Sequence, residues 1–182
     1  MRIEPEIETR VQMQQHPNTV PLLRAFLAKA KPKRVLEIGT GRGGFTLLLA
    51  GMVGAGNVRS YDKRDCVDSD VLDEIGVDRR IEDVFDHVSE IASYIKGRGR
   101  TVVFCDGGNK VYEVRKFAPL LKSGDYILAH DYAPDRHAFE AMDWRWHEIK
   151  DADIEQTVEE CGLKYVGDLA DVAWGAWRRS GG

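Results

Sequence analysis

Short apolar runs alternate with longer segments of helical periodicity along the first two thirds of the chain. This alternation is typical of an α/β protein with a parallel sheet. The apolar runs predict strands over residues 34–38, 57–61, 80–83, 101–105 and 126–129. The periodic segments predict helices over residues 20–29, 45–52, 69–75, 85–95 and 111–121. Thr19 is expected to cap the first helix, with Pro21 in its first turn.

The last third of the chain departs from this alternation. A helix is expected over residues 152–161, with Gly162 closing it. Two strands, 163–166 and 172–177, then follow with only a short connection between them. They must be antiparallel, because a parallel crossover needs a dozen or more residues. The predicted fold is therefore a three-layer α/β sandwich around a seven-stranded, mainly parallel sheet with an antiparallel C-terminal hairpin.

Composition narrows the class of protein further. The 182 residues suit one domain with a sizeable core, and 43% of them are hydrophobic. A net charge of −4 argues against nucleic acid or an anionic membrane as the partner. The polar N-terminus and the absence of a long apolar stretch indicate neither a signal peptide nor a membrane span. With three widely spaced cysteines, we expect a cytoplasmic protein without disulfides.

Glycines crowd the junction between the first strand and the following helix, at positions 39, 41, 43 and 44. Residues without a Cβ allow a sharp turn and a close approach to a ligand, and the helix N-terminus follows directly. The spacing Gly39-x-Gly41-x-x-Gly44 also fits a dinucleotide fingerprint. A nicotinamide-dependent oxidoreductase and a merely structural turn therefore remain alternatives.

Two carboxylates flank this turn. Glu37 lies on the strand just before it, where it would repel a pyrophosphate but could pair with a cationic amino-acid ligand. Asp62 ends the next strand, where its carboxylate can accept hydrogen bonds from the hydroxyls of a ribose. Asp62 suits either nucleoside, so Glu37 and the terminal hairpin carry the discrimination between them.

A second acidic pair, Asp106 and Asp131, ends the fourth and fifth strands on the same edge of the sheet. Two carboxylates there can bind a divalent cation that lowers the pKa of a substrate hydroxyl. Alternatively, both acids cap the segments that follow them.

These motifs resemble the class I S-adenosylmethionine-dependent methyltransferases, which have a Rossmann-like fold. The resemblance covers about residues 22–178 and rests on VLEIGTGRGG at 35–44, SYD at 60–62, VVFCDGG at 102–108 and the hairpin. It implies that the glycine turn cradles the methionine part of the donor, that Asp62 binds the ribose, and that Asp83 contacts the adenine. Glu82 is the less favoured choice, and Asp83 could instead cap a helix. The implied cofactor-binding residues are Glu37, Gly39, Thr40, Gly41, Gly43, Asp62, Asp83 and Asp106.

The segments VFCDGGNK at 103–110 and FAPLLKSGDYILAHD at 117–131 look like the branch of macrolide-type sugar O-methyltransferases and cephalosporin hydroxylase-like proteins. In that branch, acids after strands four and five bind magnesium, and a histidine after strand four is the base. Here Asn109 stands in the histidine's place, and an amide cannot act as a base. His130 replaces the first acid of the second pair. Asp106, His130 and Asp131 are therefore the expected catalytic and metal-binding residues, with His130 a base, a ligand or a hydrogen-bonded strand end.

The resemblance implies O-methylation of a small hydroxylated metabolite, a sugar or a natural product, with S-adenosylmethionine and possible assistance from Mg²⁺. A non-catalytic S-adenosylmethionine-binding accessory protein is the alternative that Asn109 leaves open. We expect residues 1–18 to lie across the active site or at a homodimer interface. Side chains expected near the acceptor are His16, Tyr132, Arg136, His137, Trp144 and Trp146.

Overall fold

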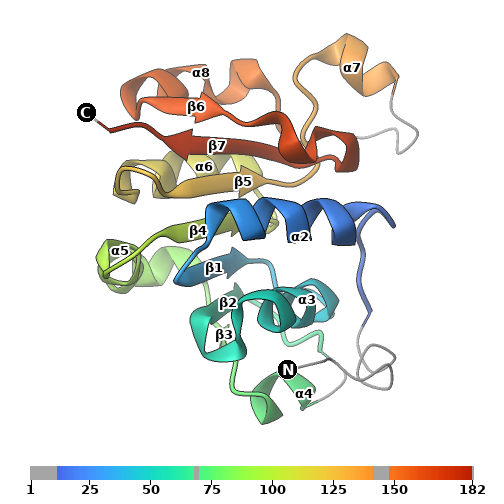
Figure 1. Cartoon of the computed structure of the whole chain (residues 1–182), viewed down its shortest axis with the longest axis vertical. Coiled ribbons are helices and arrows are strands. Elements are labelled where there is room, and N and C mark those ends of the chain that lie inside the picture. The colour runs from blue at the N-terminus through green and yellow to red at the C-terminus, as the bar shows by residue number, and fades with distance from the viewer. Residues whose placement is uncertain (1–11, 68–69, 142–147, 182) are drawn as a thin grey trace.

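A seven-stranded sheet forms the middle layer of the structure, a computed structural model that describes residues 12–67, 70–141 and 148–181 (Figure 1). The strand order is β3-β2-β1-β4-β5-β7-β6, and β7 runs antiparallel to both of its neighbours while the other pairs are parallel. The predicted fold class is therefore confirmed. The strands are β1 (Arg34–Ile38), β2 (Val58–Asp62), β3 (Asp78–Ile81), β4 (Thr101–Cys105), β5 (Tyr126–Ala129), β6 (Leu163–Tyr165) and β7 (Gly175–Arg179).

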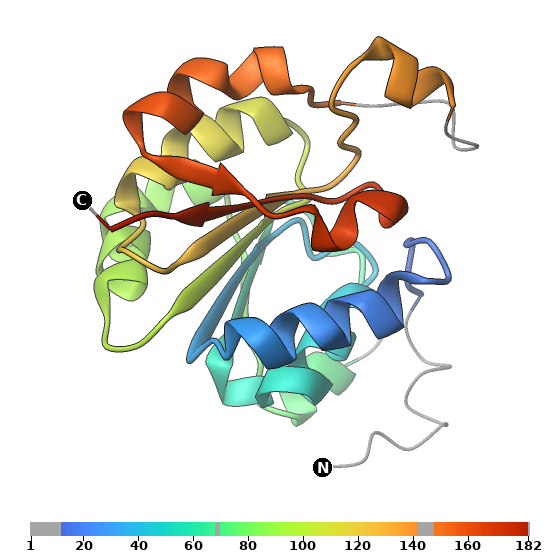
Figure 2. The ribbon, with the colours of Figure 1, turned by 45° about the horizontal axis from the view of Figure 1, so that its top comes forward.

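Helices cover both faces of this sheet, and Figure 2 shows α2 and α3 on one side with α6 and α8 on the other. The first layer holds α2 (Thr19–Ala30), α3 (Gly44–Val53) and α4 (Val71–Glu74). The second holds α5 (Val88–Lys96), α6 (Lys110–Phe117) and α8 (Asp151–Glu160). The remaining elements are α7 (Arg136–Glu140) and the 3₁₀ helices η1 (Ala55–Asn57), η2 (Val84–His87), η3 (Ala118–Leu120) and η4 (Gly167–Val172).

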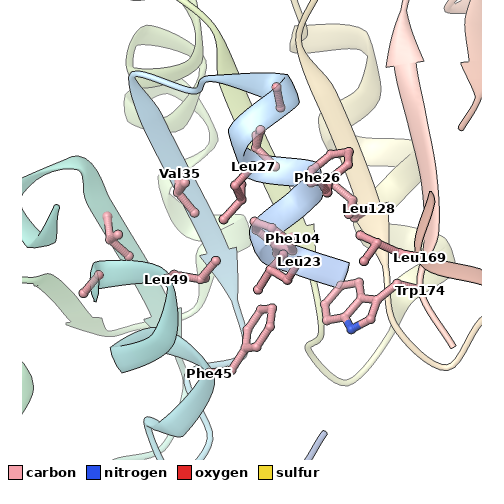
Figure 3. Packing of buried hydrophobic residues seen from close by; sticks show 14 of the residues in the cluster. Leu23, Phe26, Leu27, Val35, Phe45, Leu49, Phe104, Leu128, Leu169 and Trp174 are labelled. Carbon is pink, nitrogen blue, oxygen red and sulfur yellow. The ribbon is translucent and has the colours of Figure 1, made fainter. Parts of the chain in front are cut away.

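Each strand of the sheet centre supplies side chains to two separate cores. In β4, Val102 and Phe104 pack beneath α2 and α3, while Val103 and Cys105 face α5 and α6. Alternation along a strand explains this division, because successive side chains point to opposite faces. Figure 3 shows the first core, with Phe104 close to Phe45 of α3 and to side chains of α2.

Several boundaries differ from the expected ones for local reasons. Thr19 is the first helical residue of α2, and Asn18 occupies the N-cap without a side-chain hydrogen bond, so the expected Thr19 cap is wrong. The expected helix 111–121 ends at Phe117 and continues as η3, because Pro119 lacks the N–H that an α-helix requires. Gly162, with φ +55°, does close α8 as expected.

The last strand begins at Gly175 rather than at residue 172, because the preceding residues form η4 and Ala173 adopts the left-handed conformation (φ 60°). Trp174 therefore lies just before β7 and Trp177 within it. The two indoles belong to opposite cores. Among the described residues, none of the helices combines the length and apolar character that a bilayer crossing requires.

Candidate active site

One cavity of about 970 Å³ opens at the carboxyl ends of β1, β2, β4 and β5. The glycine turn and the end of β2 form one part of its wall, and the ends of β4 and β5 form another. The expected site residues on the wall are Gly39, Thr40, Gly41, Asp62, Asp106, His130 and Asp131. Glu37, Gly43 and Asp83 are not among the lining residues.

The glycine turn requires its glycines for two different reasons. Gly39, Gly41 and Gly43 have positive φ angles of 95°, 51° and 81°, a backbone conformation that residues with a Cβ rarely adopt. A Cβ on Gly39 would also lie 2.2 Å from the carbonyl oxygen of Asp106, whereas one on Gly41 would meet nothing within 4 Å. The turn therefore packs tightly against the end of β4 and leaves open space at its tip.

The backbone N–H groups of the four glycines are all used inside the protein. Their acceptors fix the turn to β2, to itself and to the N-terminal segment. The hydrogen bonds run from Gly39 to Tyr61 O (2.8 Å), from Gly41 to Asp62 Oδ2 (2.9 Å), from Gly43 to Thr40 O (2.9 Å) and from Gly44 to Gln12 O (3.2 Å). These N–H groups already have acceptors, so they do not form a free anion-binding nest.

Glu37 lies behind the turn, beneath α3. Its Oε2 accepts hydrogen bonds from Ser60 (2.5 Å) and Thr46 (2.6 Å), while Oε1 has no partner among the described residues. Burial raises the pKa of Glu37 to about 7. Thr40 Oγ1 lies 2.6 Å from Ser60 Oγ, and it must be the donor when Ser60 donates to an ionised Glu37. Glu37 thus supports the turn through Thr40, and its pairing with a ligand cation stays a prediction.

Asp62 closes the turn from the side of β2. Besides Gly41 N–H, it accepts a hydrogen bond from Arg64 N–H at Oδ1 (3.0 Å). A carboxylate oxygen has further lone pairs, so Asp62 can still accept hydrogen bonds from a ligand's hydroxyls. Its position on the cavity wall agrees with the ribose-binding role that the resemblance implies.

Asp83 and Glu82 exchange their expected places. Asp83 caps η2 by accepting from Phe85 N–H (3.1 Å) and pairs with Lys63 (2.7 Å), which lowers the pKa of Asp83. Glu82 instead lines the cavity, 3.0 Å from His87 Nε2. The capping alternative therefore describes Asp83 in this structure, and Glu82 is the one of these two acids that lies on the cavity wall.

Asp106, His130 and Asp131 do come together at the ends of β4 and β5. His130 Nδ1 lies 3.1 Å from Asp106 Oδ1 and 3.5 Å from Asp131 Oδ1, and the ring packs 4.8 Å from that of Trp174. Figure 3 shows Trp174 in the core beneath α2. Asp131 has a φ of 54°, an unusual conformation for a residue with a Cβ that tends to cluster at functional sites.

Lys110, which no motif in the sequence marks, lies within this acidic group. Its Nζ is 2.7 Å from Glu148 Oε2, 2.9 Å from Asp131 Oδ2 and 3.7 Å from Asp106 Oδ1. Burial lowers the pKa of Lys110, but the hydrogen bonds to Glu148 and Asp131 and the charge of Asp106 outweigh it and raise the pKa above its ordinary value. Lys110 is therefore an ammonium at any physiological pH.

The three expected metal ligands offer atoms within 4.8 Å of one another. However, each of the four oxygens of Asp106 and Asp131 has a protein nitrogen within 3.5 Å. The pairs are Asp106 Oδ1 with His130 (3.1 Å), Asp106 Oδ2 with Gln15 (3.0 Å), Asp131 Oδ1 with His130 (3.5 Å) and Asp131 Oδ2 with Lys110 (2.9 Å). The residues in this arrangement do not fit a divalent cation, because a fixed ammonium and an amide occupy its approach.

Asn109 and Glu113 organise the loop between β4 and α6. The Asn109 side chain caps α6 by accepting from Tyr112 N–H (3.0 Å), a structural role in the place of the expected base. Glu113 reaches back to the N–H groups of Asn109 and Gly107, both at 3.2 Å, and burial raises its pKa to about 7. Glu113 stands four residues after Asn109, one more than the spacing of a capping box, so that motif does not predict this contact from the sequence.

The expected acceptor-facing residues divide into three groups. Tyr132 is buried in the core, where its hydroxyl donates to Asp151 (2.8 Å), and Arg136 and His137 of α7 are not lining residues. His16 lines the cavity, together with other residues of the segment 12–16 that crosses the glycine turn. Trp144 and Trp146, like residues 1–11, lie outside the described part of the chain.

The chain is similar to known proteins in structure and not in sequence. No protein-family model matches the chain, and no curated protein sequence matches it. Among solved structures, CmcI without ligand aligns with a TM-score of 0.63 at 16% identity, covering 94% of this chain and 74% of CmcI. CmcI with Mg and S-adenosylmethionine gives 0.61 at 17%, covering 93% and 74%. An O-methyltransferase from Bacillus cereus with S-adenosylhomocysteine gives 0.58 at 13%, covering 95% and 86%.

These similarities establish the fold. The chain has the Rossmann-like architecture of S-adenosylmethionine-dependent O-methyltransferases, with the antiparallel β7 inserted between β5 and β6.

Proposed function

We propose that this protein is an S-adenosylmethionine-dependent O-methyltransferase that acts on a small hydroxylated metabolite such as a sugar or natural product. The observation that carries the proposal is the shared cavity: the glycine turn with Asp62 and the histidine–carboxylate group of His130 and Asp106 lie on the same wall. A methyl donor at the first and an acceptor hydroxyl at the second would meet in one cavity.

The glycine turn supports a sulfonium donor over a dinucleotide. A pyrophosphate needs free N–H groups at the turn and the following helix, but the four glycine N–H groups already have protein acceptors. Gly44, the first residue of α3, donates to Gln12, and a Cβ on it would lie 2.5 Å from the Gln12 backbone. The N-terminal segment therefore covers the helix end that a dinucleotide would use.

The residues of the turn fit the proposed donor. Glu37 Oε1 is a buried carboxylate oxygen without a partner among the described residues, and the tip of the turn at Gly41 faces open space. Asp62 would hold the ribose, and Glu82, which lines the cavity, would contact the adenine in place of Asp83. Bound S-adenosylmethionine supplies an electrophilic methyl group.

His130 is the base in this proposal. An ionised Asp106 beside Nδ1 holds the ring proton there, which leaves the lone pair on Nε2 to accept the proton of an acceptor hydroxyl. The ring also packs against Trp174, with 4.8 Å between the ring centroids. A carboxylate that orients an imidazole in this way is a recurrent arrangement for general-base catalysis.

Calorimetric titration with S-adenosylhomocysteine and with NAD tests the donor site. Binding of S-adenosylhomocysteine that Asp62→Asn weakens at least tenfold, and Glu155→Gln on the exposed face of α8 leaves unchanged, is the expected result. Binding of NAD alone would refute the proposal.

Transfer of a labelled methyl group to a panel of sugars and phenols then tests the reaction. Binding without transfer to any acceptor would instead favour a non-catalytic accessory protein.

A further inference from the structure

We propose that the ammonium of Lys110 is the resident cation of the acidic group at the ends of β4 and β5. On this proposal the site works without a divalent metal, and Lys110 donates a hydrogen bond to the acceptor oxygen. The first statement concerns the protein alone, while the second rests on the proposed methyl-transfer function.

The position of Nζ carries the inference. It lies between three carboxylates from separate parts of the chain, at 2.9 Å from Asp131, 2.7 Å from Glu148 and 3.7 Å from Asp106. The Lys110 side chain is only 6% exposed, although lysines almost always keep their ammonium in water. A charge so deeply enclosed is stable only when opposite charges surround it, which they do here.

The local fold holds this ammonium in place. Lys110 is the first residue of α6. The N-terminus of this helix is fixed by the Asn109 cap and by the hydrogen bond from Asn109 N–H to the Glu113 carboxylate. Displacing Nζ to admit a metal would break its contacts with Glu148 and Asp131 and leave the Lys110 ammonium without equivalent acceptors. A divalent ion would therefore compete with an intramolecular cation that is always present.

A neutral amide also contacts the acidic group. Gln15 Nε2 donates to Asp106 Oδ2 (3.0 Å), and Trp174 Nε1 donates to Gln15 Oε1 (2.9 Å), so a neutral amide is fixed on the remaining side of the group. Nitrogens from three segments of the protein, on Gln15, Lys110 and His130, thus already contact the carboxylate oxygens of Asp106 and Asp131. Such satisfaction is expected of buried carboxylates that have no metal to bind.

Lys110 also has hydrogen-bonding capacity left for a ligand. An ammonium has three N–H groups, and two of them point to Glu148 and Asp131. Since Lys110 lines the cavity, the third can donate to the acceptor oxygen. In the step that follows, that oxygen forms a bond to the methyl carbon, the carbon–sulfur bond breaks with its electron pair going to sulfur, and the hydroxyl proton passes to His130.

Titration of the purified full-length protein with Mn²⁺, followed by the loss of the free-ion electron paramagnetic resonance signal, tests the cation assignment without any acceptor. The wild-type protein should show no site tighter than about 1 mM that depends on Asp106. Lys110→Met should gain a site at least tenfold tighter, and Asp106→Asn in that background should remove it. A tight wild-type site that Asp106→Asn abolishes would overturn the proposal, and this comparison does not need the Lys110 variant to fold. A folded Lys110→Met protein without the gain would overturn it too.

The catalytic statement is tested once an acceptor is methylated. Turnover should be unchanged by EDTA or added Mg²⁺, Lys110→Met should lower kcat at least 100-fold, and Lys110→Arg, which keeps the charge, should recover part of it. Stimulation of the wild-type enzyme by Mg²⁺ after EDTA treatment would refute it. If no acceptor is found, the proposed function fails, but the Mn²⁺ titration still decides the cation assignment.

Discussion

Replacing Glu37 by glutamine should change how the stability of the protein depends on pH. Glu37 is buried beneath α3, and its pKa rises from 4.5 to about 7 mainly because burial disfavours the charged form. Between these values the folded protein holds a proton that the unfolded chain has released, so the free energy of unfolding falls as pH rises. The stabilisation is complete below pH 4.5 and is lost as pH rises through 7, and the shift corresponds to on the order of 3 kcal/mol.

Urea unfolding of the wild-type protein and of Glu37→Gln at pH 5 and pH 8 measures this effect. The variant should gain about 2 to 3 kcal/mol relative to wild type between the two pH values, because glutamine does not ionise. Comparing the two proteins at each pH cancels the contribution of Glu113, whose pKa is also raised to about 7. Glu155→Gln, an exposed control, should stay within about 0.5 kcal/mol of wild type. A wild-type-to-variant difference that is the same at both pH values would refute the reasoning.

Substitutions at four further residues test the turn and the loop after β4. Gly39→Ala places a Cβ 2.2 Å from the Asp106 carbonyl, so it should abolish binding of S-adenosylhomocysteine, whereas Gly41→Ala has open space and should cost only about 1 kcal/mol of stability in a thermal melt. Asp62→Ala leaves the N–H of Gly41 without its acceptor and should cost about 1 to 3 kcal/mol, measured by urea unfolding. Asn109→Ala should cost about 1 kcal/mol by removing a helix cap, while Asn109→Asp retains it; equal losses in both would contradict the capping role.

The elements of the central sheet were predictable because their signals are local. β1, β4 and β5 have the expected bounds, since each is a short apolar run buried on both faces. β3 begins two residues earlier than expected, at Asp78, because its charged residues are tolerated at the sheet edge that the topology gives it. The strand order places β3 at the edge of the sheet, and the residues of β3 alone do not reveal that order.

In the site, too, the part with local signals was predictable and the part built from long-range contacts was not. The turn is built from backbone conformation, which glycine spacing encodes, so Gly39, Gly41 and Asp62 could be named in advance. Lys110 meets Glu148, 38 residues further along the sequence, only because residues 148–149 lie beside the segment 131–133 that follows β5. Gln15 reaches Asp106 across 91 residues. Neither contact has a pattern that a single sequence reveals.

The difference between the glycine turn and the acidic group also explains how proteins with one fold can differ in the side chains of their sites. A turn held by its own backbone tolerates little variation, because Gly39 cannot gain a Cβ without moving the end of β4. The acidic group, in contrast, is assembled from side chains on separate segments, and one lysine at the start of α6 can supply its positive charge without altering the sheet. Structures that align over more than 90% of the chain at 13–17% identity therefore establish its backbone architecture and not the side chains around these carboxylates. A direct measurement of metal binding therefore distinguishes a site that contains the Lys110 ammonium from one that binds a metal, whereas the fold does not.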